Sequence, residues 1–378
     1  MRELIRAGLA YRCPKGFTGD APVIQGAHWS VTGRCNLKCR HCYMNAPQGQ
    51  GELPLPAMAR IARALCEGGA TSVKLTGGEP FMRKDFFDLI DLITSNGISV
   101  INIYTNATLI NERILAQIEQ AGIHPAFFVS FDGVGAHEAM RNVPGAEENT
   151  LRGIRMLQEA GHTVIVATSV DETVLPTLEK TYERMRELGV HSWGMARPLA
   201  AGCAKNMNRI SDERLAQAFE TILLRWKRDG EPFTLGLDAF YSKVVTDDMR
   251  RTIRPFADIR YACEGCRIYP HITHKGVLMP CACYADSEYG ALFANLSQVG
   301  WREAWNNPTL RNTMDVTVEE VLEANPECRS CVHLPKCRTG CRVSALLCGN
   351  GLTGLDPLSC SVYHSGVRER LAFLGGQA

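Results

Sequence analysis

Three cysteines near the start of the chain have a spacing that suits metal chemistry. Cys35, Cys39 and Cys42 form a C-x3-C-x2-C triplet. Three thiolates can hold three irons of a four-iron cluster and leave the fourth iron able to take a ligand. A structural zinc would need a fourth protein ligand, and His41 lies inside the triplet where its geometry is awkward. The triplet therefore favours an iron–sulfur cluster with an open iron over zinc.

A second group of cysteines occupies the C-terminal part of the chain. Most of the sixteen cysteines lie between Cys263 and Cys360, where Gly and Pro are also dense and no long helix is predicted. The N-terminus does not read as a secretory signal, which favours reduced, metal-binding thiols over a disulfide framework. A region with so little regular core would need metal in order to fold.

The residues around the triplet predict the elements that position it. Between about residues 28 and 230, short apolar runs alternate with amphipathic segments of helix length, as in βα units that build a parallel sheet. The predicted fold class is α/β: a partial (β/α)6 TIM-like barrel followed by a small Cys-rich domain. The triplet follows the first strand, at the rim where such barrels do chemistry. The predicted strands span residues 28–32, 72–76, 98–105, 125–131, 163–169 and 191–196.

Length and charge narrow the class of protein. With 378 residues, 45% of them hydrophobic, the chain can bury a large core and carry a second, small domain. The 41 Lys and Arg residues nearly balance the 40 Asp and Glu residues, so no net positive charge favours binding to nucleic acid or to an anionic membrane. No stretch of the sequence has the ~18 consecutive apolar residues that a membrane-spanning helix needs. We therefore expect a cytoplasmic protein that binds neither nucleic acid nor a membrane. The expected domains are an N-terminal extension (1–27), the barrel (28–235), and a linker with the Cys-rich domain (236–378).

The triplet and the residues that follow it resemble the signature of the radical S-adenosylmethionine (SAM) superfamily. Tyr43 follows the triplet, and Gly77, Gly78, Glu79 and Pro80 at the end of the second predicted strand are similar to that family's GGEP motif. The glycines let backbone approach a ligand, and Glu79 can accept from the α-amino group of SAM. Polar residues after later strands are similar in placement to SAM-contacting residues, although each alone could be an ordinary loop residue: Thr105, Asn106, Ser130, Asp132, Arg141, Arg152 and Arg197.

The resemblance implies a reaction. A reduced [4Fe–4S] cluster on the triplet would cleave SAM to methionine and a 5′-deoxyadenosyl radical, and the radical would remove hydrogen from a substrate. The electron would come from an external donor of the flavodoxin or ferredoxin type. The alternative from another class, a non-catalytic metal scaffold, has no use for an open iron or for Glu79.

The C-terminal cysteines resemble the seven-cysteine pattern of SPASM domains, which carry two auxiliary [4Fe–4S] clusters. With the cluster on the triplet, the resemblance implies three clusters. Cys263 is the natural fourth ligand of the nearer auxiliary cluster, and Cys283 competes with it. Cys66 lies on an apolar helix face and is expected to be buried. By the family's pattern the distal cluster would be held by Cys328, Cys331, Cys337 and Cys360, and the nearer one by Cys266, Cys281 and Cys341.

The resemblance also favours a ribosomally made peptide as substrate, with a cross-link, thioether, epimerised centre or oxidised residue as product. About 27 residues precede the first strand, too few for a leader-binding domain with its own core, so a separate leader-binding protein or the barrel itself would recognise the peptide. The alternative is a non-peptide substrate such as a tetrapyrrole, a sugar or a cofactor precursor.

One departure from the family pattern bears on the reaction. In sulfatase-maturing members of the SPASM family, an Asp thought to act as a base follows the cysteine that matches Cys281; here that residue is Ala282, which cannot act as a base. Cys283 could instead donate hydrogen to a substrate radical. The alternatives are that Cys283 binds iron or is merely buried.

Overall fold

A single ten-stranded sheet forms the centre of the protein. The computed structural model describes residues 24–44, 51–198, 200–207, 210–238, 240–242, 260–263 and 265–374. The first seven strands are parallel and follow one another in chain order across the sheet. They are β1 (Gly26–Ser30), β2 (Ser72–Thr76), β3 (Ser99–Thr105), β4 (Ala126–Ser130), β5 (Val164–Ser169), β6 (Ser192–Ala196) and β7 (Thr234–Leu237).

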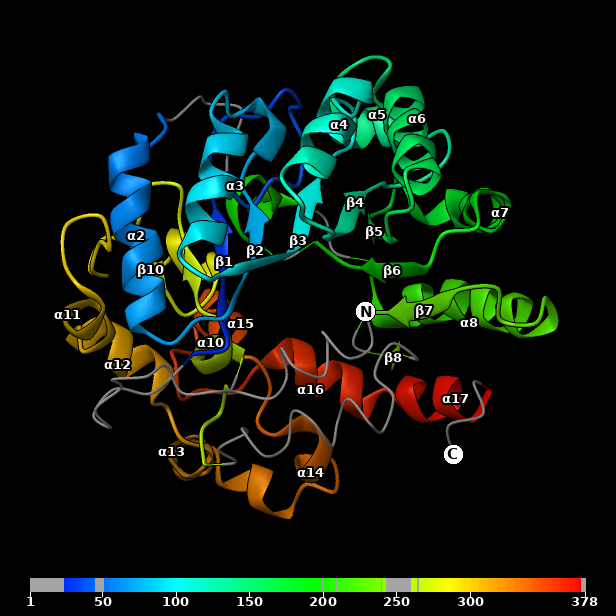
Figure 1. Cartoon of the computed structure of the whole chain (residues 1–378). Helices are drawn as coiled ribbons and strands as arrows, with labels where there is room; N and C mark the ends of the chain where they lie inside the picture. The colour runs from blue at the N-terminus through cyan, green and yellow to red at the C-terminus, as the bar shows by residue number, and fades with distance from the viewer. Residues whose placement is uncertain are drawn as a thin grey trace.

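Helices cover the outer face of this sheet (Figure 1). The longer helices bury apolar side chains on one side; Ile61 and Leu65 of the first, for example, are fully buried. Side-chain caps fix several starting points, as where Asn111 accepts from the backbone N–H of Ile114 at 3.0 Å. The helices are α2 (Leu55–Glu67), α3 (Phe86–Ser95), α4 (Glu112–Gln120), α5 (His137–Arg141), α6 (Ala146–Glu159), α7 (Leu178–Leu188) and α8 (Asp212–Arg228).

The α/β prediction is confirmed, and all six predicted strands occur. The sheet nevertheless continues beyond them. Strand β7 extends the parallel array across the expected boundary at 235/236, and β8 (Tyr241–Ser242) pairs antiparallel with it. On the other edge, β9 (His271–Ile272) pairs parallel with β1, and β10 (Leu278–Met279) pairs antiparallel with β9. The Cys-rich region therefore contributes strands to the barrel sheet.

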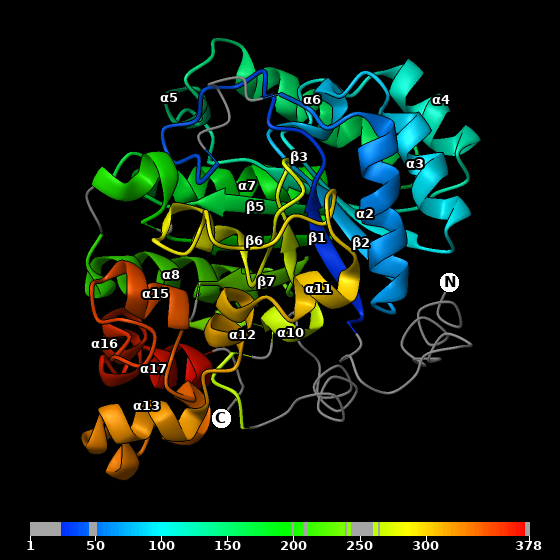
Figure 2. The ribbon, with the colours of Figure 1, turned by 90° about the vertical axis from the view of Figure 1, so that its left-hand side faces the viewer.

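The rest of the C-terminal region consists of short helices. They gather on one side of the barrel (Figure 2). Trp301 and Trp305 stack at 4.9 Å, and Trp301 packs against Gly68 at the end of α2. The helices are α10 (Gly265–Ile268), α11 (Trp301–Trp305), α12 (Pro308–Met314), α13 (Val318–Ala324), α14 (Leu334–Cys337), α15 (Arg342–Leu347), α16 (Pro357–His364) and α17 (Val367–Leu374).

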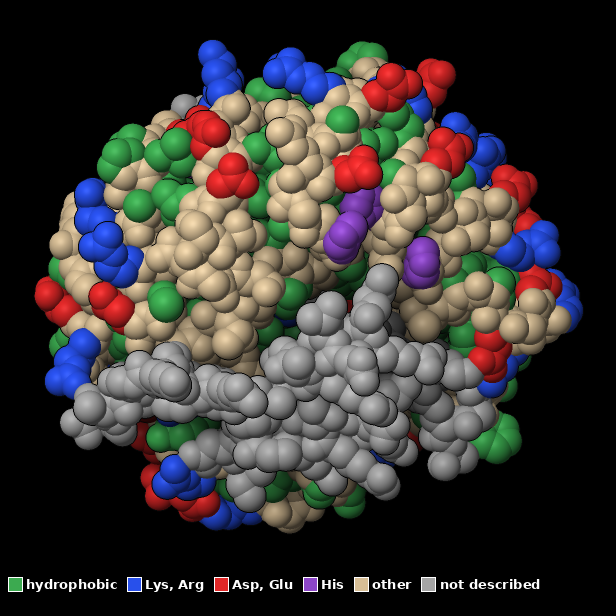
Figure 3. Space-filling model, in the orientation of Figure 1, with side chains coloured by type: hydrophobic (Ala, Val, Ile, Leu, Met, Phe, Trp, Pro, Cys, Tyr) green, Lys and Arg blue, Asp and Glu red, His purple; other side chains and the backbone are tan. Residues whose placement is uncertain are grey.

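The surface carries both signs of charge. On the face shown in Figure 3, acidic and basic side chains of the described residues are interspersed, as the near-equal counts of 41 and 40 lead one to expect. Among the described residues, no helix combines the length and apolarity needed to cross a membrane.

Candidate functional site

A cavity of about 940 Å³ lies along the inner face of the sheet and reaches two groups of cysteines. Cys35 follows the end of β1, at the rim where the parallel strands end. Met279 pairs with His271, which pairs with His28, so residues just after β10 lie near the end where the parallel strands begin. The cavity therefore has the triplet at one end and, at the other, Cys263, Cys266, Cys281, Cys283 and Cys341.

The glycine motif after β2 presses against the triplet loop. The backbone N–H of Gly78 donates to the Thr32 carbonyl at 3.0 Å, and that of Glu79 donates to the Arg34 carbonyl at 2.8 Å. A Cβ on Gly78 would lie 2.2 Å from the Arg34 carbonyl oxygen, so only glycine fits. Both Gly77 and Gly78 line the cavity. The motif thus positions the triplet loop as well as exposing backbone to a ligand.

Glu79 lies behind these glycines, fully buried. Its carboxylate accepts from the Thr105 hydroxyl at 2.8 Å and from the Asn106 backbone N–H at 2.7 Å, which joins the end of β2 to the end of β3. Burial raises its pKa to about 7. Thr105 and Asn106 line the cavity, whereas Glu79 does not. A carboxylate can accept about four hydrogen bonds, so Glu79 has acceptor capacity beyond these two. Its predicted contact with the amino group of SAM stays a prediction.

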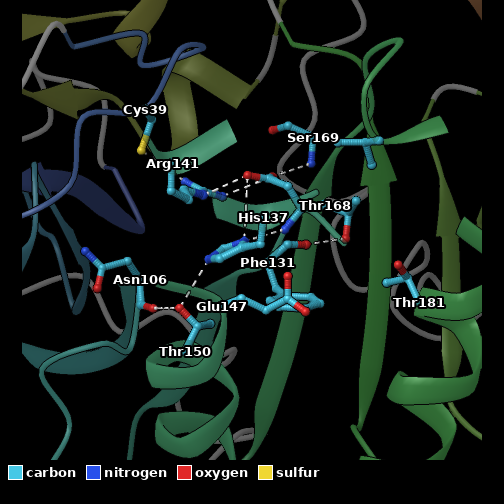
Figure 4. Close-up of polar contacts among 12 residues, drawn as sticks. Cys39, Asn106, Phe131, His137, Arg141, Glu147, Thr150, Thr168, Ser169 and Thr181 are labelled. Carbon is cyan, nitrogen blue, oxygen red and sulfur yellow. Dashed lines mark hydrogen bonds and ion pairs between the residues drawn. The ribbon is translucent and has the colours of Figure 1, made fainter. Parts of the chain in front are cut away.

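A buried network after β4 supports the second cysteine of the triplet (Figure 4). Arg141 lines the cavity and donates to the Cys39 sulfur at 3.4 Å. Its guanidinium also makes two contacts of 3.0 and 2.7 Å with Asp132, which is fully buried. Arg141 holds the pKa of Asp132 below its usual range despite burial, which alone would raise it. Arg141, one of the residues predicted to contact SAM, is therefore already paired with an acid.

His137 completes this network as a neutral ring. The Asp132 backbone N–H donates to Nδ1 at 3.0 Å, so the ring proton is on Nε2, 3.3 Å from the Thr150 hydroxyl. That hydroxyl donates to the Asn106 carbonyl at 2.9 Å. Burial lowers the pKa of His137 to about 3. The chain of contacts ties the ends of β3 and β4 together beneath the triplet.

The other predicted SAM contacts separate into two sets. Tyr43 and Ser130 line the cavity, and the Tyr43 hydroxyl is hydrogen-bonded to Thr76. Pro80, Arg152 and Arg197 are outside its lining. Arg152 is exposed on α6 and donates to the Thr108 carbonyl at 3.4 Å. Arg197 is held by Asp212 and, at 2.9 Å, by Asp238, which joins β6 to α8 and to the end of β7.

The nearer auxiliary group has more thiols than one cluster needs. The Cys266 thiol donates to the Cys263 carbonyl at 3.2 Å. The side chains of Cys281 and Cys283 are hydrogen-bonded to each other, which raises the pKa of Cys281 strongly. Burial raises the pKa of Cys341 to about 11. Because Cys263 and Cys283 both line the cavity, the choice of fourth ligand stays open.

The distal group surrounds a separate cavity of about 420 Å³, lined by Cys328, Cys331, Cys337 and Cys360. Asp356, at the start of α16, connects the two auxiliary groups. Its carboxylate accepts from the Cys341 backbone N–H at 2.9 Å and from the Ser344 hydroxyl at 2.7 Å. The same side chain lines the distal cavity.

The chemistry of these donor sets fits iron–sulfur clusters, because the clustered side chains are thiols. Burial raises the pKa of Cys35 to about 12, and iron would supply the positive charge that a buried thiolate lacks. Within the described ranges, no set of three or more Cys, His, Asp or Glu is arranged to hold a single metal ion. Cys66 is exposed, so the expectation that it is buried was wrong. Cys203 and Cys348 are exposed too, and Cys13 lies outside the described residues.

Sequence reasoning missed a polar layer between the two cysteine groups. His28, Lys74, Tyr104, Tyr269 and His271 all line the cavity. The interior of such barrels is usually filled by branched apolar side chains. A signal was present, because His28 and Lys74 interrupt otherwise apolar strands at inward positions, but their common face becomes evident only from the strand register.

Comparisons with known proteins agree with this geometry. Residues 29–189 match the family model of the Radical SAM superfamily. The AdoMet-dependent heme synthase of Oleidesulfovibrio alaskensis is 27% identical over 78% of this chain and 78% of its own. The PqqA peptide cyclase of Gluconobacter oxydans is 25% identical over 90% of this chain and 91% of its own.

A solved structure shares the fold over almost the whole length. Native anSMEcpe, with bound AdoMet and a peptide, matches with a TM-score of 0.70 at 16% identity, over 93% of this chain and 98% of that one. At this identity the likeness concerns the fold. With the triplet and the glycine motif at the rim, these findings show that residues 29–189 form a radical SAM domain, and that the chain as a whole shares the fold of anSMEcpe.

Proposed function

We propose that this protein reductively cleaves SAM and uses the resulting radical to remove hydrogen from a substrate held between the triplet and the nearer auxiliary cysteines. The observation that carries the proposal is the 940 Å³ cavity, which both cysteine groups line. When bound, the triplet cluster would supply the electron that cleaves SAM.

The protein's own residues would hold SAM and exclude water. Gly77 and Gly78 present backbone at the rim, next to the triplet loop. Thr105 and Asn106, fixed by Glu79, would contact the ribose, and Ser130 would lie alongside them. Arg141 keeps the loop that carries Cys39 in place. Thr105, Asn106 and Arg141 are positioned by buried hydrogen bonds, so these groups need little reorganisation when SAM binds.

We assign three [4Fe–4S] clusters to the three groups of thiols. The distal set Cys328, Cys331, Cys337 and Cys360 shares one cavity, as a four-thiolate site requires. Anaerobically purified protein should then contain about 12 irons, and removal of the triplet should lower this by about a third. Stoichiometric zinc without visible charge-transfer absorption would contradict the assignment.

For the substrate we favour a peptide. PqqA peptide cyclase aligns over nearly the full length of this chain, and the structure of similar fold holds a peptide with AdoMet. The second candidate is a tetrapyrrole, because heme synthases are also among the relatives that align over most of the chain. Either substrate would need an external electron donor, and a peptide substrate could need a separate leader-binding protein.

The test uses anaerobically reconstituted protein with SAM and dithionite. We expect 5′-deoxyadenosine by mass spectrometry, lost when Cys35, Cys39 and Cys42 are changed to Ala and retained in the matched control Cys348→Ala. Peptides encoded beside the gene and iron coproporphyrin III are then offered separately, and the one that changes in mass or in stereochemistry identifies the class. Absence of 5′-deoxyadenosine from fully loaded protein would refute the proposal.

Cys283 has a distinct test as a hydrogen donor. A donated hydrogen atom would leave a sulfur radical, which one electron from the external donor and one proton would restore. In D2O the product should carry one solvent deuterium, and Cys283→Ala should make 5′-deoxyadenosine and keep its iron but form no such product. Loss of iron would instead identify Cys283 as a ligand, and normal product would exclude the donor role.

A further inference from the structure

The polar layer between the two cysteine groups is a single row across the sheet. His271 pairs with His28, His28 with Lys74, and Lys74 with Asn102. Residues paired in parallel strands point to the same face, so these four side chains share the inner face. Tyr104, two residues after Asn102, lies on that face as well. The row thus lines the inside of the barrel.

Lys74 is a cation without an acidic partner among the described residues. Its ammonium lies 4.1 Å from the centre of the Tyr269 ring, and the Tyr269 hydroxyl is 3.2 Å from that of Ser72. Burial lowers the pKa of Lys74, with no carboxylate to offset it. An ammonium in a cavity wall that lacks a counter-charge favours an anionic ligand.

The neighbours of Lys74 are neutral and cannot supply the missing charge. His28 and His271 are held neutral, with pKa values lowered by burial to about 4 and about 3. Burial raises the pKa of Tyr104 to about 12. The His28 ring lies 5.9 Å from Tyr104 and 6.1 Å from Tyr269. Lys74 therefore lies against the Tyr269 ring, and the flat rings of His28 and Tyr104 that line the same cavity suit the apolar body of a ligand.

We propose that Lys74 binds a carboxylate of the substrate inside the barrel, with His28, Tyr104 and Tyr269 flanking the group that carries it. This inference rests on the proposed function for its location between the two cysteine groups. It restricts the substrate to organic acids: a peptide with an acidic side chain or a tetrapyrrole with carboxylate arms. Lys74 would decide which part of the substrate faces SAM.

Binding can be tested without reductant, on fully reconstituted protein with SAM. The probes are iron coproporphyrin III with its tetramethyl ester, and a capped Glu-containing pentapeptide with its Gln counterpart. We expect one acid to bind about 10-fold or more tightly than its neutral counterpart, as a charged hydrogen bond would give. The acid that does so identifies the source of the carboxylate.

Lys74→Met should abolish this preference, Lys74→Arg should keep most of it, and Lys180→Met, an exposed lysine on α7, should behave as the unmodified protein. A preference retained in Lys74→Met, or no preference for either acid in the unmodified protein, would overturn the inference. SAM cleavage by the unmodified protein is measured separately. Its failure would refute the proposed function while leaving the binding result to be judged alone.

Discussion

The triplet and the C-terminal cysteines are positioned by different physical means. The triplet follows β1, whose outward side chain Trp29 is fully buried. Leu75 of β2 and Ile103 of β3, beside Trp29 in the sheet, are fully buried as well. The loop is then held by the backbone of Gly78 and by Arg141. In this part of the chain, buried apolar strands and these polar contacts together position the triplet loop.

The C-terminal cysteines lie on or beside elements of only a turn or two. Cys337 ends α14, Cys341 precedes α15, and Cys360 lies within α16. Their support is polar: Asp356 holds the backbone of Cys341, and Arg342 donates to the carbonyls of Leu352 and Gly354 at 3.0 and 2.8 Å. From this comparison we expect that metal matters less for the order of the barrel than for the order of the C-terminal region.

The strongest way to break this comparison is to remove iron. If these thiols hold a cluster as proposed, Cys328→Ala or Cys337→Ala should lose the order of the short C-terminal helices, because metal–thiolate bonds would tie these helices together. Limited proteolysis and circular dichroism should show cleavage after about residue 260 while most barrel helicity survives. Cys348→Ala, an exposed cysteine of the same region, is the control. Equal stability with and without iron would make the two regions alike.

A second test asks whether the barrel network is as important as its apolar packing. Asp132→Asn removes the partner of buried Arg141, and breaking such a pair costs about 3–5 kcal/mol. We expect that loss in the free energy of unfolding, measured by denaturant titration with clusters loaded. Asp91→Asn, on the exposed side of α3, should change it by less than about 0.5 kcal/mol. A loss as small as the control's would show that apolar packing alone orders the triplet loop.

A third test concerns the contribution of Glu79 to the proposed SAM site. Glu79→Ala should weaken SAM binding by about 10- to 150-fold, because a charge-assisted contact is worth roughly 1.5–3 kcal/mol and Thr105 and Asn106 lose their acceptor. Equilibrium binding of SAM to the reconstituted protein measures this. Glu112→Gln, exposed at the start of α4, serves as the control. Unchanged affinity would remove Glu79 from the site.

The smallest effect is a pH dependence of stability. The folded-state pKa of His137 is about 3 and the ordinary value is 6.5, so the neutral ring costs nothing above pH 6.5 and destabilises the fold progressively as the pH falls below it. Each unit costs about 1.4 kcal/mol. His137→Gln should reduce the stability lost between pH 6.5 and 5.5 by about 1 kcal/mol, because that interval starts at the unfolded pKa, whereas His124→Gln, at an exposed position, should not. Identical pH slopes in all three proteins would show that His137 is not held neutral.

The parts of this molecule that sequence predicted well are those with local signals. Strand β2 occurs at the predicted residues because an apolar β-branched run marks it. Strands β9 and β10 have two residues each and depend on pairing with distant β1, so no local pattern reveals them. Likewise Glu79 was recognised by its motif, but its contacts with Thr105 and Asn106 depend on how two strands pair.

The assignment of cysteines to clusters came from family resemblance, whereas the role of Lys74 required the register. In sequence, Lys74 is one polar residue in SVKLT. Only its pairing with His28 and Asn102 shows that three polar side chains share one face. Arg152 and Arg197 were predicted to contact SAM but lie outside the lining of the cavity. A position after a strand does not determine whether a long side chain turns toward the cavity or toward an acid on a helix.

The hairpin of β9 and β10 has a consequence for how the chain can be divided. Edge strands with unpaired backbone groups invite association with other chains. Here the Gln25 N–H donates to the Ile268 carbonyl and the His28 N–H to the Pro270 carbonyl, so the C-terminal region masks the open edge of β1. A fragment cut after the barrel would expose that edge and self-associate. We therefore expect the region that carries the C-terminal thiols also to keep this edge of the barrel from pairing with other chains.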